Sequence, residues 1–203
     1  MGRGSAVIDS KALLYGAIPP RPKTDLSKTR TLRNRAIEHY NQLGLLYKIT
    51  VPEGSRYKNP WLVARAPMSI YLNSDGQLHR VGGAAAESDS GIKEYWVNGL
   101  RHREDGPAID WPGSRKEYWV NNQRHRTNGP AIEWDDGSKE YLIRGQRHRE
   151  NGPAIEISGG DIEYWIKGQI HREDGPAVVH ANGDCEYWLE DKQVFKSTLE
   201  AKG

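Results

Sequence analysis

A Glu-Tyr pair occurs five times between residues 94 and 187, always at a step of 23 residues. The glutamates are Glu94, Glu117, Glu140, Glu163 and Glu186. Histidines keep the same step at His79, His102, His125, His148 and His171, and Gly-Pro-Ala triplets begin at Gly106, Gly129, Gly152 and Gly175. An unbroken period of this length is typical of repeat architectures. A residue that returns in every unit is therefore first a part of the architecture and only second a candidate for chemistry.

Each unit contains a predicted β-hairpin. Asn98-Gly99 lies between two short alternating runs, and this dipeptide favours a two-residue type I′ turn. The turn fixes a register in which Val97 faces Leu100, Trp96 faces Arg101, Tyr95 faces His102 and Glu94 faces Arg103. Because side chains alternate across a strand, Glu94 and Trp96 are expected on one face and Tyr95 on the other.

This register predicts three kinds of cross-strand contact. Ion pairs are expected for Glu94–Arg103, Glu117–Arg126 and Glu163–Arg172, and cation–π contacts for Trp96–Arg101 and Trp119–Arg124. The histidines are expected to pack against the tyrosines, with their ring nitrogens satisfied by neighbours.

Two further turns complete the unit, one at Gly-Pro and one at a later glycine such as Gly113 or Gly137. Glycine and proline interrupt strands, so each unit reads as a short β-meander that must stack on its neighbours to bury its apolar face. The predicted fold is mainly β: an elongated single-chain array of hairpin repeats over residues 68–203, with five units, and a small N-terminal α+β lobe. Divergent end units are expected to cap the array, with Phe195 as a hydrophobic lid.

The N-terminal third does not repeat. Residues 1–24 are expected to form an extended arm, and residues 25–67 a small basic lobe. There, Leu32, Ala36, Tyr40 and Leu43 have helical spacing, and Leu45–Val51 and Trp61–Ala64 have strand character. Six cations of the lobe are candidates for contact with an anion or nucleic acid: Lys28, Arg30, Arg33, Arg35, Arg56 and Lys58. The alternative is a solvated, charged helix face.

Charge is divided unevenly between these two parts. Residues 1–67 carry 12 Lys+Arg and 4 Asp+Glu, and the remainder carries 17 and 23, so a net charge of +2 conceals +8 and −6. The mean hydropathy is −0.82, and no stretch is long and apolar enough for a membrane span. A single cysteine excludes an intramolecular disulfide framework and, like the absence of a signal-peptide core, favours a cytoplasmic protein.

The pattern does not favour an enzyme. A catalytic site is usually one asymmetric constellation, whereas evenly spaced identical units provide no such asymmetry. No phosphate-binding glycine loop, nucleophile elbow or zinc-binding helix motif occurs, and we expect no catalytic residue, metal or cofactor.

Tryptophan and arginine are favoured anchors of protein interfaces. The candidate partner-binding residues are therefore Trp96, Arg101, Trp119, Arg124, Arg147 and Trp165. Stacking of nucleobases on the same residues is the alternative, but the net charge of −6 on the array would repel a phosphate backbone.

The 23-residue period, with its Tyr-Trp strand and two glycine turns, resembles the MORN-repeat class and especially its variant form, over about Met68 to Phe195. The chain differs from the common motif in its His-Arg-x-x-Gly-Pro-Ala half. Such repeats mostly act as binding or scaffolding surfaces and occur in bacterial and phage proteins, including antitoxins. The resemblance implies a phage- or mobile-element-type inhibitor that occupies the surface of a bacterial host protein or complex, such as a defence system, in the host cytoplasm. Nucleic-acid or nucleotide binding through the basic lobe remains the alternative.

Overall fold

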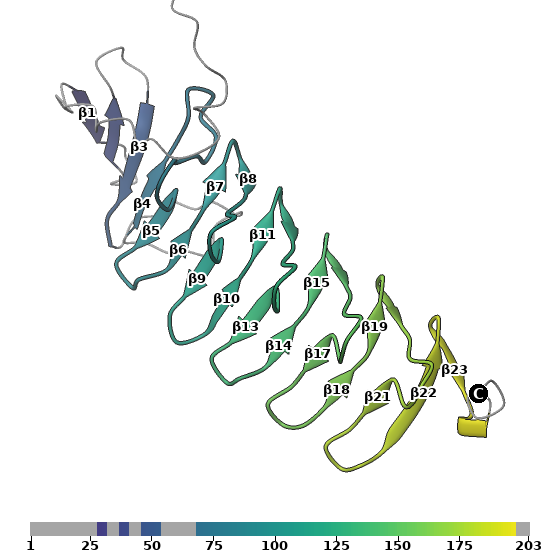
Figure 1. Cartoon of the computed structure of the whole chain (residues 1–203). Helices are drawn as coiled ribbons and strands as arrows, with labels where there is room; N and C mark the ends of the chain where they lie inside the picture. Colours follow the sequence, from purple (N-terminus) through teal and green to yellow (C-terminus); the bar gives the residue numbers. More distant parts are fainter. Residues whose placement is uncertain (1–27, 32–36, 41–45, 54–67, 198–203) are drawn as a thin grey trace, which may run out of the picture.

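The computed structural model describes residues 28–31, 37–40, 46–53 and 68–197, which form an elongated array of short strands lying across its long axis (Figure 1). One antiparallel sheet of 15 strands runs through these residues. In spatial order its strands are β1 (Lys28–Thr31), β2 (Ile37–Tyr40), β3 (Leu46–Val51), β4 (Met68–Tyr71), β5 (Ala86–Ser88), β6 (Lys93–Glu94), β9 (Ile109–Trp111), β10 (Arg115–Glu117), β13 (Ile132–Trp134), β14 (Lys139–Glu140), β17 (Ile155–Glu156), β18 (Ile162–Glu163), β21 (Val178–Val179), β22 (Cys185–Leu189) and β23 (Lys192–Val194).

Two-stranded hairpins form a second row along one edge of this sheet (Figure 1). They are β7 (Trp96–Val97) with β8 (Leu100–Arg101), β11 (Trp119–Val120) with β12 (Gln123–Arg124), β15 (Leu142–Ile143) with β16 (Gln146–Arg147), and β19 (Trp165–Ile166) with β20 (Gln169–Ile170). Most units thus contribute two strands to the sheet and one hairpin to the row. This confirms the predicted fold class of an elongated, mainly β array of hairpin repeats.

The predicted hairpin register is confirmed where the structure pairs its strands. Trp96 lies opposite Arg101 and Val97 opposite Leu100. Asn98 and Gly99 have φ angles of 47° and 77°, as a type I′ turn requires. The amide of His102 donates to the carbonyl of Tyr95 at 3.2 Å, which extends the same register by one residue.

Each unit is bonded to the next along both rows. In the hairpin row, the Arg103 amide donates to the Trp119 carbonyl at 3.0 Å and the Asn122 amide to the Arg101 carbonyl at 2.9 Å. At the sheet, the Tyr118 amide donates to the Ala131 carbonyl at 2.8 Å. Since these contacts join neighbouring units, stability comes mainly from nearest-neighbour interfaces.

The core is thin and built from small residues. The alanines of the Gly-Pro-Ala triplets, Ala108, Ala131, Ala154 and Ala177, are all 0% exposed, which explains why a side chain larger than a methyl group does not occur there. A larger apolar cluster joins β3 and β4 to the first unit and includes Val51, Ile70 and Trp96.

The predicted N-terminal helix is wrong where the structure describes it. Lys28–Thr31 and Ile37–Tyr40 are strands that pair with each other, and β2 pairs in turn with β3. Four apolar residues at helical spacing were too few to outweigh the strand pairing offered by a sheet edge. The expected strand at Leu45–Val51 is confirmed as β3. The expected arm (1–24) and the strand at Trp61–Ala64 lie outside the described residues.

The predicted lid is also wrong, because the Phe195 side chain is 83% exposed instead of covering the last unit. Its neighbour Val194 pairs with Tyr187 and ends β23. Among the described segments, no helix has the length and apolar character needed to cross a membrane.

Candidate partner-binding surfaces

The first two repeated glutamates are buried inside the array, whereas Glu140, Glu163 and Glu186 are partly exposed. Glu94 is 0% and Glu117 is 1% exposed. Glu117 stands opposite Ile109 on one side and Ile132 on the other, so its side chain shares a sheet face with two buried isoleucines. Burying a carboxylate among apolar groups is costly unless it is paired and hydrogen-bonded.

Three donors surround the Glu117 carboxylate. The Nε of Arg115 lies 2.5 Å from Oε1, while Trp119 Nε1 and Arg124 Nε lie 3.0 and 3.1 Å from Oε2. Burial alone would raise the pKa of Glu117, but the hydrogen bonds and positive charges of Arg115 and Arg124 outweigh it and lower the pKa. The carboxylate therefore stays ionised and fully hydrogen-bonded, which suits a structural group better than a general base.

The predicted Glu–Arg ion pairs are therefore wrong, because these glutamates do not contact the arginine nine residues along the chain. In the first three full units the glutamate contacts the arginine seven residues along the chain, as in Arg147 Nε to Glu140 at 2.6 Å and Arg101 Nη2 to Glu94 at 3.7 Å. Glu163 accepts instead from Trp165 Nε1 at 2.7 Å. The strand changes from the sheet to the hairpin at the intervening tyrosine, so a register that runs straight through from the hairpin to the glutamate does not hold.

The predicted Trp–Arg contacts do occur, and they extend between units. The Arg101 guanidinium lies 4.8 Å from the ring centre of Trp96 and 5.2 Å from that of Trp119, so it bridges two successive units. Arg124 lies 5.0 Å from the Trp119 ring. A second group places Arg147 4.8 Å from the Trp165 ring. The structure thus brings all six predicted partner-binding residues into two stacks, which we call the Trp–Arg stacks.

Only part of these stacks is accessible. Trp96 is 4% exposed and belongs to the core, whereas the side chains of Arg124 and Arg147 are each 40% exposed. A groove of about 610 Å³ passes beside the first stack. Its lining includes Trp96, Arg101 and Trp119 together with Leu72, Leu78 and the turn residue Asn122. This volume is in the usual range of ligand sites.

The opposite face carries a second set of stacks that the sequence did not reveal. Arg103, Arg126, Arg149 and Arg172 each lie over a tyrosine of their own unit, at 3.8 to 4.0 Å from the ring centre. Each also donates to the carbonyl of the proline four residues later. The tyrosines are therefore covered by arginine and not by histidine as predicted. The constant eight-residue step from Tyr to Arg was the available signal.

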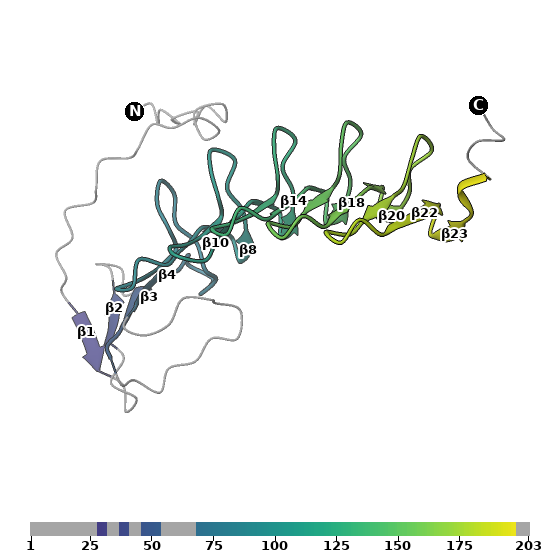
Figure 2. The ribbon, with the colours of Figure 1, turned by 90° about the horizontal axis from the view of Figure 1, so that it is seen from below.

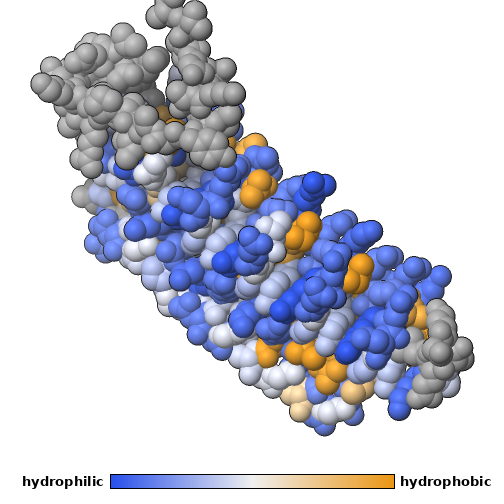
Figure 3. Space-filling view, viewed as in Figure 1, coloured by the Kyte–Doolittle hydropathy of each residue, from blue (hydrophilic) through white to orange (hydrophobic). Residues whose placement is uncertain are grey.

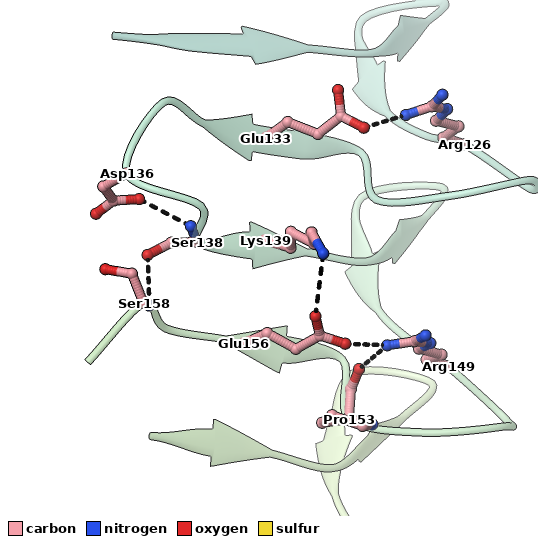
Figure 4. Close-up of polar contacts among 9 residues, drawn as sticks. All are labelled: Arg126, Glu133, Asp136, Ser138, Lys139, Arg149, Pro153, Glu156 and Ser158. Carbon is pink, nitrogen blue, oxygen red and sulfur yellow. Dashed lines mark hydrogen bonds and ion pairs between the residues drawn. The ribbon is translucent and has the colours of Figure 1, made fainter. Parts of the chain in front are cut away.

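The ion-pair partners of these arginines vary between units. Arg126 contacts Glu133, and Arg149 contacts Glu156, which Lys139 also approaches at 3.6 Å (Figure 4). Arg103 and Arg172 instead contact Asp105 and Asp174 of their own loops, at 2.8 and 2.7 Å. For Arg172, the sheet position equivalent to Glu133 and Glu156 is occupied by Val179, which offers no carboxylate.

The repeated histidines join one hairpin to the next. The Nδ1 atoms of His79, His102, His125, His148 and His171 accept hydrogen bonds at 3.1 to 3.3 Å from the backbone amides of Asn98, Asn121, Arg144, Lys167 and Glu190, respectively. Because Nδ1 is the acceptor, the neutral imidazole carries its proton on Nε2. The histidine ladder is thus an element of the architecture, and no catalytic arrangement is needed to explain it.

The basic lobe gives little site geometry. Lys28 and Arg30 lie in β1, with only their backbone positions described, while Arg33, Arg35, Arg56 and Lys58 fall outside the described residues. Within the described part of the chain, no group of three or more His, Cys, Asp or Glu residues could hold a metal ion. No family model matches the chain, and no curated protein matches it either.

Proposed function

We propose that this chain is a non-enzymatic, protein-binding repeat scaffold that acts by occupying the surface of a partner. The groove beside the first Trp–Arg stack carries this proposal, because it has a volume of about 610 Å³ and is lined by Leu72, Leu78, Trp96 and Trp119 together with Arg101. The side chains of Arg124 and Arg147, each 40% exposed, present further guanidinium groups along the row of stacks. Large aromatic and arginine side chains are the residues that most often supply binding energy at protein interfaces.

The electrostatics of the stacks support a binding role over a catalytic one. Glu117 has a lowered pKa and three donors, so it has little tendency to accept a proton from a substrate. Its ion pairs with Arg115 and Arg124 instead fix the orientation of both guanidinium groups. A rigid, pre-organised surface loses less entropy when it binds.

The kind of partner follows from the resemblance to MORN-type variant repeats alone. On that basis we propose that the partner is a bacterial host protein, such as a component of a defence system. This chain would then be a phage- or mobile-element-type inhibitor that acts in the host cytoplasm.

The test begins with nuclease-treated bacterial lysate passed over the immobilised protein, followed by purification of the retained partner. Its Kd is then measured by calorimetry for the wild type, Arg124→Ala, Arg147→Ala and the control Lys116→Ala. Lys116 is an exposed cation on the opposite face of the same sheet. We expect a loss of about tenfold or more for each stack variant and none for the control. Unchanged affinity in both correctly folded stack variants would remove the Trp–Arg stacks from the interface.

The second candidate function is nucleic-acid or nucleotide binding by the basic lobe, favoured by the net charge of +8 on residues 1–67. Fluorescence anisotropy with labelled single-stranded and duplex DNA should then show affinity that falls steeply with salt. The combined variant Arg30→Gln, Arg33→Gln and Arg35→Gln should flatten that dependence. An absence of binding at low salt would eliminate this candidate.

A further inference from the structure

A row of loops projects from one side of the sheet, one after each hairpin (Figure 2). Adjacent loops enclose grooves, and two of these are lined by equivalent positions three repeat periods apart. The first, of about 340 Å³, includes Tyr95, Val97 and His102; the second, of about 580 Å³, includes Tyr164, Ile166 and His171. We call these two grooves, and the corresponding positions of the units between them, the loop-side sockets.

Each socket has an apolar side chain in its lining. Val97 is 38% exposed in the first socket, and Ile166 takes the same place in the second. Val120 and Ile143 occupy the corresponding hairpin positions of the units between them. Figure 3 shows hydrophobic spots that repeat along the array between hydrophilic side chains. An aliphatic group therefore recurs once per unit on an otherwise polar surface.

Once the ion pairs of the arginines are counted, the charge that remains at the rims of the sockets is negative. Every arginine in the two linings is already paired: Arg80 with Glu87, Arg103 with Asp105, Arg149 with Glu156 and Arg172 with Asp174. Three glutamates remain, Glu104, Glu150 and Glu173, which are 78 to 79% exposed. Within the described segments, the only ion-pair neighbour of each is the histidine two residues earlier, at 3.6 to 3.9 Å.

An apolar lining with a carboxylate at the rim matches one kind of side chain. Lysine and arginine have an aliphatic stem that packs on apolar surface and a cationic head that stays at the rim. The spacing of the sockets adds a second condition. Each unit advances the sheet by two strands, and strands lie about 4.8 Å apart, so successive sockets are about 10 Å apart. Three residues of a polyproline II chain make one full turn and span about 9 Å, so every third side chain of such a chain points to the same side at nearly this spacing.

We propose that the loop-side sockets bind an extended, basic polypeptide segment of a partner, with a lysine or arginine at every third residue seated in successive sockets. Trp96 lines both the first socket and the groove beside the first Trp–Arg stack, but Arg124 and Arg147 line neither socket. Variants of these two arginines therefore test the stacks without altering the sockets.

The probes are two fluorescein-labelled 15-residue peptides with the same composition of five Lys, five Ser and five Pro. In the spaced peptide the lysines occupy every third position, and in the clustered peptide they are contiguous. Anisotropy titrations at about 0.15 M salt, where the screening length is about 8 Å, measure binding to the full chain. We expect the spaced peptide to bind at least about tenfold more tightly, because only its lysines reach several sockets at once.

Variants of the protein test both parts of the socket. The triple variant E104Q/E150Q/E173Q should weaken binding of the spaced peptide by about tenfold or more. The control D75N/D89N/D135N removes three exposed charges elsewhere and should change it less than about twofold. V97S/I166S, which alters only the apolar lining, should weaken it by about threefold or more. Thermal unfolding checks that each variant is folded.

Equal binding of the two peptides, or equal weakening by the two triple variants, would reduce the effect to general electrostatics and overturn the proposal. A lower affinity of the R124A/R147A variant for the spaced peptide would also contradict the proposal, since those two residues line neither socket. The failure of the proposed function and that of the sockets can therefore be told apart.

Discussion

At the scale of single residues, the glutamate of the repeat is the residue whose role changes most between sequence and structure. A Glu-Tyr pair suggests an exposed cross-strand ion pair. Glu117 is instead buried between two isoleucines and held by two arginines and an indole. Removing one partner of such a group leaves the others desolvated and unpaired, which is costly.

This geometry predicts which arginine is coupled to Glu117. In a double-mutant cycle on the free energy of unfolding, Glu117→Ala and Arg124→Ala should show a coupling of about 1 kcal/mol, a modest value because Arg124 is 40% exposed. Glu117→Ala and Arg126→Ala should be additive, since Arg126 contacts Glu133. The reverse result, with coupling to Arg126 alone, would restore the register expected from the hairpin turn.

The pH dependence of stability tests the same carboxylate. The pKa of Glu117 is lowered from its ordinary value of 4.5, so its stabilising contribution is fully present above that value and is lost as the pH falls through the lowered pKa. Chemical unfolding of the wild type and Glu117→Gln should therefore differ most near neutral pH. The difference should shrink as the pH drops below about 4.5, because the carboxyl of the unfolded chain takes up a proton there while the folded one stays ionised down to its lowered pKa. A gap that is constant down to pH 3 would speak against an ionised Glu117.

At the scale of elements, the hairpin turn varies while its backbone conformation does not. Asn98 has a φ of 47°, and Lys167 at the equivalent position has a φ of 52°. Asparagine tolerates this left-handed conformation, whereas lysine adopts it at a cost. The amide of Lys167 must nevertheless stay in place, because it donates to Nδ1 of His148 at 3.3 Å.

Replacing Lys167 by asparagine should therefore stabilise the protein. We expect Lys167→Asn to raise the free energy of unfolding by about 0.5 to 1 kcal/mol, because it removes strain from the turn. Gln169→Asn, at an exposed strand position of the same hairpin, should not raise it. Denaturant unfolding at constant m-value gives both numbers, and a stabilisation of similar size in the two variants would rule out relief of turn strain.

The contacts within the hairpin could be predicted from the sequence, whereas the contacts between the hairpin and the sheet could not. Asn98-Gly99 predicts its turn and the pairing of Trp96 with Arg101, because both depend on residues within six positions of each other. The partner of Glu117 depends on where the strand passes from sheet to hairpin, and no local signal marks Tyr118 as that point. The stack of Arg126 on Tyr118 was missed for a related reason, since the loop folds back over the face of the sheet.

At the scale of the whole molecule, the array is a set of interchangeable interfaces. The backbone amide of Ala131 donates to the backbone carbonyl of Glu140 at 2.8 Å, and that of Ala154 to the carbonyl of Glu163 at 2.7 Å, so the two contacts have nearly the same geometry. A unit removed at equivalent points should therefore leave its two neighbours complementary to each other.

Deleting residues 118–140 joins Glu117 to Tyr141 and removes one full period. We expect a folded, shorter array with unchanged β-type circular dichroism per residue and a lower midpoint of thermal unfolding, because one stabilising interface is lost. Deleting residues 118–139 removes 22 residues and should disrupt the fold, since it shifts every later side chain out of register. Equal tolerance of the two deletions would contradict the strict nearest-neighbour arrangement.

The orientation of the strands also governs how the array responds to force. The strands lie across the long axis, so the hydrogen bonds that join them run along it (Figure 1). Tension applied between the two ends therefore loads these bonds one after another and does not shear many of them together. A pulled array would open from its ends in steps of one unit at low force, and its length would become a mechanical variable set by how many units remain closed.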